Sequence, residues 1–321
     1  MTTYRQGQGY RIRSVTSDPD NAKVGQVWYN SIELKLKGVI SVDASWASGG
    51  NLGTARMSLA GCGATQDAAL AFGGNTTPFP ATARNETEEY NGSSWSEQSN
   101  LGTARGYLSG AGTQTAGLAF GGSPSKNETE EYDGTSWSDQ NNLSTARGSL
   151  AGFGTQTAGV ACGGYTSTAL TSTEHYNGSS WTAGGNMNTA NYQFAAAGVL
   201  TAGLAWAGQN PSKQQTEEYN GTAWTSVPAT LNQATFNQAG AGVQTAAISM
   251  LGRDSSNLTA TELYDGTSWT TSANAATARR QLGGAGTNSL ALAFGGYTSD
   301  QVNSTEEFTG VTTPVRSFDV S

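Results

Sequence analysis

Six glutamates are the most regularly placed residues in this 321-residue sequence that could carry chemistry. Each follows a threonine, as in "TEEYNGSSW" (87–95), and each lies two residues before a tyrosine or phenylalanine. The six are Glu88, Glu130, Glu174, Glu217, Glu262 and Glu306. A pair of carboxylates can hydrolyse a glycoside, but one active site does not need six equivalent carboxylates. We therefore expect a structural role for these glutamates.

Four arginines stand at the start of the predicted first strand in four copies of the repeat and could neutralise the glutamates. They are Arg56, Arg105, Arg147 and Arg279. The expected contact is a Glu–Arg or Glu–backbone interaction between neighbouring repeats. The residue after each glutamate varies among Glu, His and Leu, which predicts that this position faces solvent.

The supply of histidine limits the remaining enzyme chemistry. His175 is the only histidine, which excludes a histidine-ligated copper or zinc centre and a Ser-His-Asp triad. "YDGTSW" lacks the Asp-x-Gly spacing of the sialidase Asp box, and no arginine cluster suits a sialic acid carboxylate. A glycosidase with paired carboxylates stays open, because Asp and Glu are available. We predict a non-enzyme with no catalytic residue, metal or cofactor.

The glutamate motif belongs to a repeat of four predicted strands. In one copy the strands are 105–114, 115–122, 128–134 and 135–140, and Asn-Gly or Asp-Gly joins the last two in five copies, a strong hairpin signal. The second strand recurs around Phe72, Phe120, Cys162, Trp206, Met250 and Phe294. Four antiparallel strands at a period of roughly 44 residues predict the blades of an all-β propeller.

The order of features within the repeat resembles the Kelch family. That family shows a glycine doublet, a tyrosine, a tryptophan and then an arginine; here they are Gly121-Gly122, Tyr132, Trp137 and Arg147. The resemblance covers about residues 38–310 and implies a Kelch-type β-propeller. Only four residues separate Tyr132 from Trp137, fewer than the usual Kelch spacing, which marks a divergent branch.

The last glutamate motif, "TEEFTG" (305–310), stops before a tryptophan. Trp46 precedes the first complete repeat, in a segment that matches the one around Trp95. We therefore expect the N-terminal segment to supply the fourth strand of the blade formed by residues 280–308. The predicted domains are an arm with a β-hairpin (1–37), a six-bladed propeller closed by the N-terminal strand (38–310) and a C-terminal tail (311–321).

Composition and charge narrow the function. The net charge of −8 argues against nucleic-acid binding, which needs a clustered basic face. No apolar run predicts membrane insertion, and the polar start "MTTYRQGQGYRIRS" does not resemble a signal peptide. Cys62 and Cys162 fall at different positions of the repeat and are expected to be free, buried thiols.

Any ligand is expected on the face formed by the loops between second and third strands, because these loops vary on a uniform scaffold. Six aromatic residues are the candidates there or near the channel mouth: Phe79, Tyr107, Tyr165, Tyr192, Phe236 and Tyr297. Packing of the loops on one another is the competing interpretation. Tryptophans and tyrosines of the motif itself are expected in the core between blades, with their polar ends hydrogen-bonded.

The N-terminal segment "GQVWYN…LKG" predicts two strands, Gly25–Tyr29 and Leu34–Lys37, joined by a tight turn at Asn30-Ser31. It resembles short hairpin modules of bacteriophage tail-fibre and other virion proteins, especially marine ones. That resemblance implies a virion protein made in the host cytoplasm without a signal peptide. The arm would then bind other virion proteins, with a homo-oligomer in the particle.

The function expected from these features is that of a non-enzymatic bacteriophage structural protein. The propeller would be displayed on a tail fibre, neck or capsid appendage and would contact a host surface glycan. Two other classes stay open at this point. One is a free glycan-binding lectin, and the other is a Kelch-type scaffold that binds a protein partner on its loop face.

Overall fold

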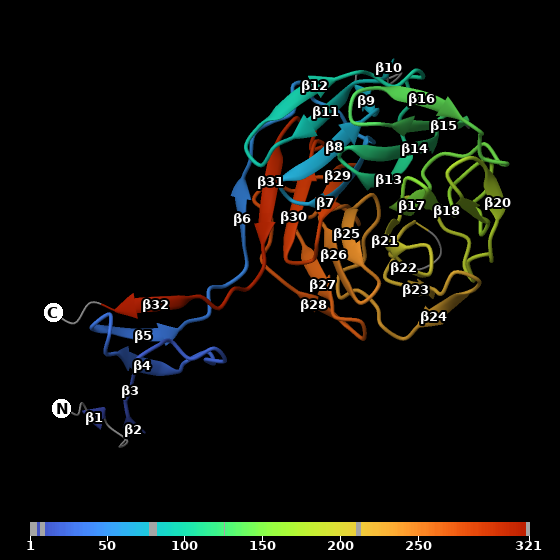
Figure 1. Cartoon of the computed structure of the whole chain (residues 1–321). Coiled ribbons are helices and arrows are strands. Elements are labelled where there is room, and N and C mark those ends of the chain that lie inside the picture. The colour runs from blue at the N-terminus through green and yellow to red at the C-terminus, as the bar shows by residue number, and fades with distance from the viewer. Residues whose placement is uncertain (1–4, 7–9, 77–81, 125, 210–212, 319–321) are drawn as a thin grey trace. The chain divides into compact units, whose positions relative to one another are not determined.

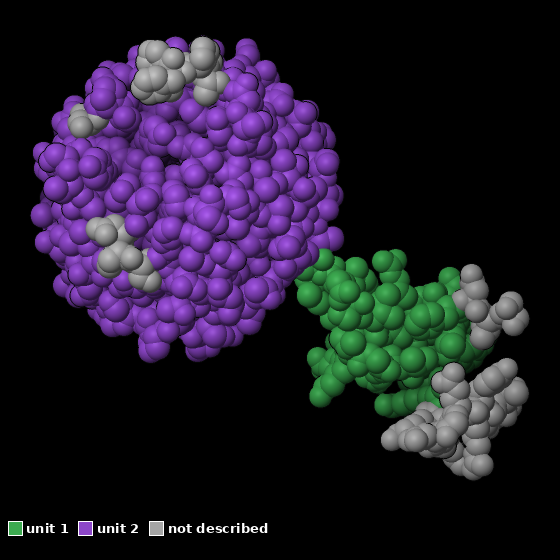
Figure 2. All heavy atoms as spheres, turned by 180° about the vertical axis from the view of Figure 1, so that it is seen from behind, with its two compact units in different colours: residues 1–44, 310–321 green, residues 45–309 purple. Residues whose placement is uncertain are grey.

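A computed structural model describes residues 5–6, 10–76, 82–124, 126–209 and 213–318. The chain forms two compact units (Figure 2). Unit 1 consists of residues 1–44 and 310–321, and unit 2 of residues 45–309. The boundary near the N-terminus therefore follows residue 44, seven residues after the boundary predicted at residue 37.

Within the described residues, unit 2 contains six four-stranded antiparallel sheets, numbered here 1 to 6 in chain order. First strands are β7 (Ala60–Thr65), β13 (Ser109–Thr113), β17 (Ala151–Thr155), β21 (Ala195–Val199), β25 (Ala239–Val243) and β29 (Gly283–Gly286). Second strands are β8 (Ala68–Phe72), β14 (Ala116–Gly122), β18 (Ala158–Cys162), β22 (Ala202–Trp206), β26 (Ala246–Met250) and β30 (Leu290–Phe294). Third strands are β11 (Thr87–Tyr90), β15 (Lys126–Tyr132), β19 (Thr173–Tyr176), β23 (Thr216–Tyr219), β27 (Thr261–Tyr264) and β31 (Thr305–Thr309).

Fourth strands are β12 (Trp95–Gln98), β16 (Trp137–Gln140), β20 (Trp181–Ala183), β24 (Trp224–Val227), β28 (Trp269–Thr271) and β6 (Ser45–Ser48). Two short strands, β9 (Asn75–Thr76) and β10 (Thr82–Ala83), pair in a loop of sheet 1. The sheets surround a common centre with their first strands innermost (Figure 1). This repetition of four-stranded sheets is a propeller-like, all-β arrangement.

Burial follows the position of each strand in its sheet. The second strands are buried along most of their length, as in the burial of Leu70, Ala71 and Phe72 at 0% exposure. Their small and apolar residues pack against both neighbouring sheets, whereas fourth strands such as β12 and β20 begin at a half-buried or buried tryptophan and continue with mostly exposed residues. The core of unit 2 therefore lies between the sheets rather than at one centre.

Strand β6 comes from the N-terminal side of unit 2 but completes sheet 6. It pairs antiparallel with β31, and Trp46 lies opposite Phe308. Their rings are 5.3 Å apart between centroids. The pairing of the Trp46 segment with the last repeat is therefore present, as the sequence predicts.

The first strands are shorter than predicted. Strand β13 begins at Ser109 rather than at residue 105. Residues 105–108 instead form the link from the preceding sheet, and Tyr107 adopts a left-handed backbone with φ of 54°. A residue at this φ cannot continue a strand, which explains the late start.

Tryptophans tie each sheet to the one before it. In every sheet the indole Nε1 of the fourth-strand tryptophan donates a hydrogen bond to a threonine Oγ1 of the preceding sheet, at 2.9–3.1 Å. The pairs are Trp46–Thr261, Trp95–Thr305, Trp137–Thr87, Trp181–Thr129, Trp224–Thr173 and Trp269–Thr216. These contacts explain why both residues recur in the motif.

Glutamines at the turns between first and second strands make a second link that sequence analysis did not predict. The side-chain amide of Gln114 donates to the carbonyls of Ala69 and Tyr90 in the preceding sheet. Gln66, Gln156 and Gln244 make the equivalent pair of bonds. Each amide satisfies two carbonyls that the strands themselves leave open.

Unit 1 contains a sheet in the order β3 (Arg13–Val15), β4 (Val27–Asn30), β5 (Lys35–Val39) and β32 (Val315–Phe318). Two short strands, β1 (Arg5–Gln6) and β2 (Tyr10–Arg11), pair separately. The predicted hairpin of β4 and β5 is present, but residues 31–34 separate its strands in place of a tight turn at Asn30-Ser31. The C-terminal segment, predicted as a tail, supplies the edge strand β32.

A polar cluster stabilises the buried side of unit 1. Lys37 is 8% exposed, and its ammonium group donates to Asp18 at 2.7 Å and to Glu33 at 2.5 Å. Trp28 and Asn30 also donate to Asp18. The hydrogen bond from Lys37, followed by those from Asn30 and Trp28, lowers the pKa of Asp18 to about 2. None of the described segments forms a helix that could cross a membrane.

Candidate functional site

The six recurring glutamates lie inside the sheets and hold the links that enter each sheet. In four sheets a buried arginine faces the glutamate at 2.7–3.1 Å. These pairs are Arg56–Glu88, Arg105–Glu130, Arg147–Glu174 and Arg279–Glu306. The arginines also donate to backbone carbonyls, as Arg105 does to Glu128 at 2.6 Å. Their terminal nitrogens make contacts within the fold, and their Nε atoms are buried without a partner among the described residues, so these arginines offer no exposed charge to a substrate.

Sheets 4 and 5 lack the arginine and replace it with asparagine three residues earlier. In sheet 5 the backbone and side-chain amides of Asn232 both donate to Glu262 at 2.8 Å. In sheet 4 the amides of Asn188 donate to Glu217. The glutamate therefore anchors the incoming link in all six sheets by accepting from a backbone amide, to which a guanidinium is added in four sheets and an asparagine side chain in two.

The residue after each glutamate is half-buried, whereas the sequence predicts a solvent-facing position. It faces the tyrosine of the next sheet: Tyr132 donates to Glu89 at 3.0 Å, and Tyr264 to Glu218 at 3.1 Å. Burial, and then the facing carboxylate, raises the pKa of Tyr264 to about 12. Leu263 stands at this position in sheet 5, and the tyrosine of sheet 6 is replaced there by Phe308, which has no hydroxyl. The residue type at this position therefore varies with the residue that it faces in the next sheet.

His175 takes the same position in sheet 3, where its Nε2 lies 2.6 Å from the Tyr219 hydroxyl. Burial lowers the pKa of His175 below its usual 6.5. The unfolded chain therefore takes up the proton first as pH falls, so this group destabilises the folded state below about pH 6.5. We expect the melting temperature to fall between pH 7 and pH 5.5, and His175→Glu to weaken this fall. The measurement is thermal unfolding at both pH values, and an equal fall in both proteins would contradict the role of His175.

Six residues at equivalent positions surround the centre of unit 2 and form a ring of backbone hydrogen bonds. They are Ser58, Tyr107, Ser149, Gln193, Asn237 and Gln281, called the ring residues below. Each N–H donates to the carbonyl of the ring residue in the preceding sheet, and that of Ser58 donates to Gln281, all at 2.7–2.9 Å. All six have φ between 53° and 57°. This left-handed conformation directs six side chains of different type toward one place.

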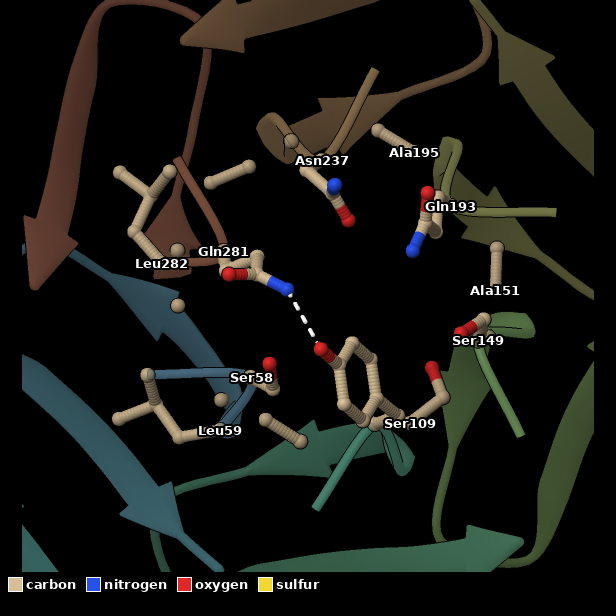
Figure 3. A pocket seen from close by; sticks show the side chains of 18 of the residues that line it. Ser58, Leu59, Ser109, Ser149, Ala151, Gln193, Ala195, Asn237, Gln281 and Leu282 are labelled. Carbon is tan, nitrogen blue, oxygen red and sulfur yellow. Dashed lines mark hydrogen bonds between the residues drawn. The ribbon is translucent and has the colours of Figure 1, made fainter. Parts of the chain in front are cut away.

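These side chains line a pocket of about 150 Å³ at the centre of unit 2, called the axial pocket below. At about 30 Å³ per water molecule, this volume corresponds to about five waters. Figure 3 shows Ser149, Gln193, Asn237 and Gln281 around the opening. Deeper in, alanine, serine and glycine of the first strands line the walls, as at Ala151 and Ser109. Among the described residues that line it there is no Asp, Glu, His, Lys, Arg or Cys.

Tyr107 and Gln281 meet inside the axial pocket. The side-chain amide of Gln281 donates to the Tyr107 hydroxyl at 2.8 Å (Figure 3). The two residues belong to sheets 2 and 6, and sheet 1 with Ser58 lies between them. The bond therefore joins two sheets that are not neighbours and holds the phenol ring at the pocket.

Of the five predicted aromatic residues that the structure describes, only Tyr107 lines the axial pocket. Tyr192 and Phe236 directly precede ring residues but pair with other groups. Tyr165 and Tyr192 have ring centroids 4.9 Å apart, and the Lys213 ammonium lies 5.1 Å from the Phe236 ring. Phe236 is only 9% exposed.

Tyr297 lies beneath the guanidinium of Arg280, 4.6 Å from its ring centroid. Phe79 falls outside the described residues. Tyr165, Tyr192, Phe236 and Tyr297 therefore make contacts within the loops, Tyr165 is 41% exposed, and binding of a ligand at these four positions stays a prediction.

The other five ring residues were missed from the sequence. Each stands two residues after the buried arginine or its replacement, as Ser149 stands after Arg147 and Asn237 after Thr235. Alignment of the repeats at this offset shows a variable polar or aromatic residue that leucine follows in four of the six repeats, and this signal was available. Their convergence on one pocket depends on the left-handed backbone, which no residue type in the series demands.

The two cysteines and the remaining acidic groups add no second site. Cys62 and Cys162 are free and buried, as predicted, and burial raises the pKa of each thiol to about 12. Across the residues that the structure describes, no three His, Cys, Asp or Glu side chains gather so as to hold a metal ion.

Comparison with known proteins supports the fold and goes no further. No protein-family model matches the chain, and no curated protein matches it either. Among solved structures, 395 chains are similar. The structure of YjhT aligns with a TM-score of 0.67 over 82% of this chain and 99% of YjhT, at 12% sequence identity. A likeness at this identity concerns the fold alone.

Proposed function

We propose that this chain is a non-enzymatic structural protein of a bacteriophage virion, in which unit 1 attaches to the particle and unit 2 presents a recognition face. Unit 2 would be a divergent Kelch-type propeller of six blades, one for each sheet, closed by β6. The tail fibre, neck and capsid appendages are the candidate locations. A host surface glycan is the proposed contact. The virion setting rests on the sequence resemblance of the N-terminal hairpin.

Closure of six blades is supported by contacts that return to their starting point. The backbone bonds of the ring residues run through all six sheets, from Ser58 back to Gln281. The tryptophan–threonine bonds do the same, and Trp95 of sheet 1 reaches Thr305 of sheet 6. A closed ring covers both faces of every blade and leaves only short strand edges exposed.

The uncharged lining of the axial pocket is the observation that carries the proposal of binding without catalysis. Hydrolysis of a glycoside requires an acid and a base or nucleophile at the scissile bond. The axial pocket offers amides, hydroxyls and one phenol. The six recurring glutamates lie within the sheets, where they anchor the links. A surface that only binds a glycan needs neither a catalytic acid nor a base or nucleophile.

The proposed attachment role is tested by removing unit 1. Because β32 belongs to the same sheet as β5, the deletion must take residues 1–44 and 310–321 together and leave β6 in place. We expect the truncated chain to be lost from purified particles, at least tenfold below wild type by immunoblot. Circular dichroism and thermal unfolding of the truncated chain check that unit 2 remains folded.

A matched variant separates attachment from recognition. Gln193→Gly changes the axial pocket and leaves unit 1 intact, so it should enter particles at the wild-type level. Equal incorporation of the truncated and full-length chains would overturn the attachment role. Under the alternative of a free lectin, the truncated chain would bind glycans as well as the full chain and neither would enter particles.

A further inference from the structure

We propose that the axial pocket binds a neutral, polyhydroxylated ligand, such as a terminal uncharged sugar of a larger glycan. This inference rests on the proposed recognition role and gives it a place and a ligand class. It differs from the aromatic loop site expected from the sequence, because the residues that carry it are amides and hydroxyls on the innermost links of the sheets.

The backbone of the ring residues shows that their side chains are retained at a cost. A left-handed φ near 55° is strained for a residue with a side chain and unstrained for glycine. Glycine occupies other left-handed positions of the same repeats, such as Gly73 and Gly121. None of the six ring residues is glycine. Strained positions that keep polar side chains and converge on a pocket indicate a functional site.

The chemistry of the lining selects an uncharged ligand that both donates and accepts hydrogen bonds. Amide side chains of Gln193 and Asn237 and the hydroxyls of Ser109 and Ser149 offer both kinds of group. Sugar hydroxyls also donate and accept, so they can pair with this lining in either sense. An anionic or cationic ligand would lose its hydration without meeting an opposite charge, which is unfavourable.

Two buried polar atoms of the lining have no hydrogen-bond partner among the described residues. They are the hydroxyl Oγ of Ser58 and the Oε1 of Gln238, in residues that are 6% and 7% exposed. Gln238 uses only its amide nitrogen, which donates to the carbonyl of Trp206 at 3.2 Å. Buried polar groups are almost always paired. Neither atom is exposed to solvent, so a ligand hydroxyl pairs with them only if the side chains of Ser58 and Gln238 rotate into the pocket.

The phenol of Tyr107 adds a planar surface at the same place. Its hydroxyl is fixed by the 2.8 Å bond from Gln281, so the ring needs little further ordering when a ligand binds. An aromatic ring beside amides and hydroxyls suits the apolar C–H face and the polar rim of a sugar ring. A volume of about 150 Å³ accommodates one small ring rather than a chain.

The test measures binding to the full-length chain by titration calorimetry and saturation-transfer NMR. Probes are the methyl glycosides of glucose, galactose, mannose and N-acetylglucosamine, together with glucuronic acid and N-acetylneuraminic acid as charged sugars. We expect at least one neutral glycoside to bind in the millimolar range and the charged sugars to bind at least tenfold more weakly. Binding only of a charged sugar, or of none of the probes, would overturn the proposal.

Variants decide whether the axial pocket is responsible. Gln193→Gly and Gln281→Gly remove the side chains and relieve the left-handed strain, so we expect equal or higher melting temperatures with binding at least tenfold weaker. Gln140→Ala removes an amide from the outer strand β16 and should leave affinity unchanged. Unchanged binding in both glycine variants would place the ligand elsewhere and overturn this inference.

The outcome separates this inference from the proposed function. If the full-length chain binds glycan arrays or host cells while every axial-pocket variant binds equally well, recognition stands and the axial site is wrong. If the chain with an intact pocket binds neutral glycosides but is absent from particles, the axial site stands and the virion role is wrong.

Discussion

Replacing Trp46 with alanine is expected to lower the free energy of unfolding of unit 2 by about 2–3 kcal/mol. Truncation of a fully buried tryptophan to alanine lowers the free energy of unfolding by about 3–5 kcal/mol. The expected loss is smaller here because Trp46 is half-buried. Its ring packs on Phe308, and its Nε1 donates to Thr261 and to the carbonyl of Ala273. The substitution therefore weakens sheet 6 and its bond to sheet 5 at once.

Chemical denaturation followed by near-ultraviolet circular dichroism measures this effect. Trp28→Ala is the matched control, because Trp28 is buried in unit 1 and donates to Asp18 there. We expect this control to leave the unfolding transition of unit 2 unchanged. A Trp46→Ala transition within 0.5 kcal/mol of wild type, the range ordinary for surface substitutions, would show that β6 contributes little.

Deletion of residues 1–48 removes unit 1's N-terminal part together with the whole of β6. Without β6, the third strand β31 becomes the edge of sheet 6, and its unpaired N–H and C=O groups are open to other chains. Such a chain should self-associate, whereas deletion of residues 1–44 and 310–321 keeps β6 and should not. The comparison by size-exclusion chromatography separates loss of unit 1 from loss of the fourth strand.

Local signals explain which parts of the fold were predictable. Asn-Gly and Asp-Gly turns specify a hairpin from two residues, so the third and fourth strands were found correctly. Trp46 could be assigned to the last repeat because that repeat lacks its own tryptophan. Strand β32 carries no such signal: "VRSF" is a short segment whose partner, β5, is more than 270 residues away in sequence.

The site was less predictable because it depends on contacts between sheets. Glu89, His175 and Leu263 look like random variation until the tyrosine or phenylalanine of the next sheet is seen beside them. The ring residues are similar, since Ser58 and Gln193 acquire a common role only when six links meet at one centre. Aromatic residues drew attention in the sequence, yet most of them pair with neighbouring loop residues instead of lining the axial pocket.

Replacing Glu130 with alanine is expected to lower the free energy of unfolding of unit 2 by about 3–5 kcal/mol, because it leaves the Arg105 guanidinium buried without a counter-charge. Arg105 is 0% exposed and Glu130 is 1% exposed. Burial raises the pKa of Glu130 despite the opposing charge of Arg105. Burial of the two charges is therefore costly, so the intact pair adds little to the free energy of unfolding. The large loss arises because the substitution leaves one buried charge without its partner.

Sheet 5 provides the control, since it anchors its link without an arginine. Gly102→Asn with Arg105→Thr copies Asn232 and Thr235 of sheet 5 into sheet 2 and keeps Glu130. Residue 102 has room for the change: a Cβ there would meet its nearest neighbour, Oε2 of Glu130, at 3.4 Å. The new asparagine should donate to Glu130 as Asn232 does to Glu262.

We expect the free energy of unfolding of this double variant to fall by less than about 2 kcal/mol, because no charge is left buried without a hydrogen-bonding partner. If urea denaturation gives the double variant the same loss as Glu130→Ala, the guanidinium itself is required in sheet 2. Amide anchoring would then be a property of sheets 4 and 5 alone.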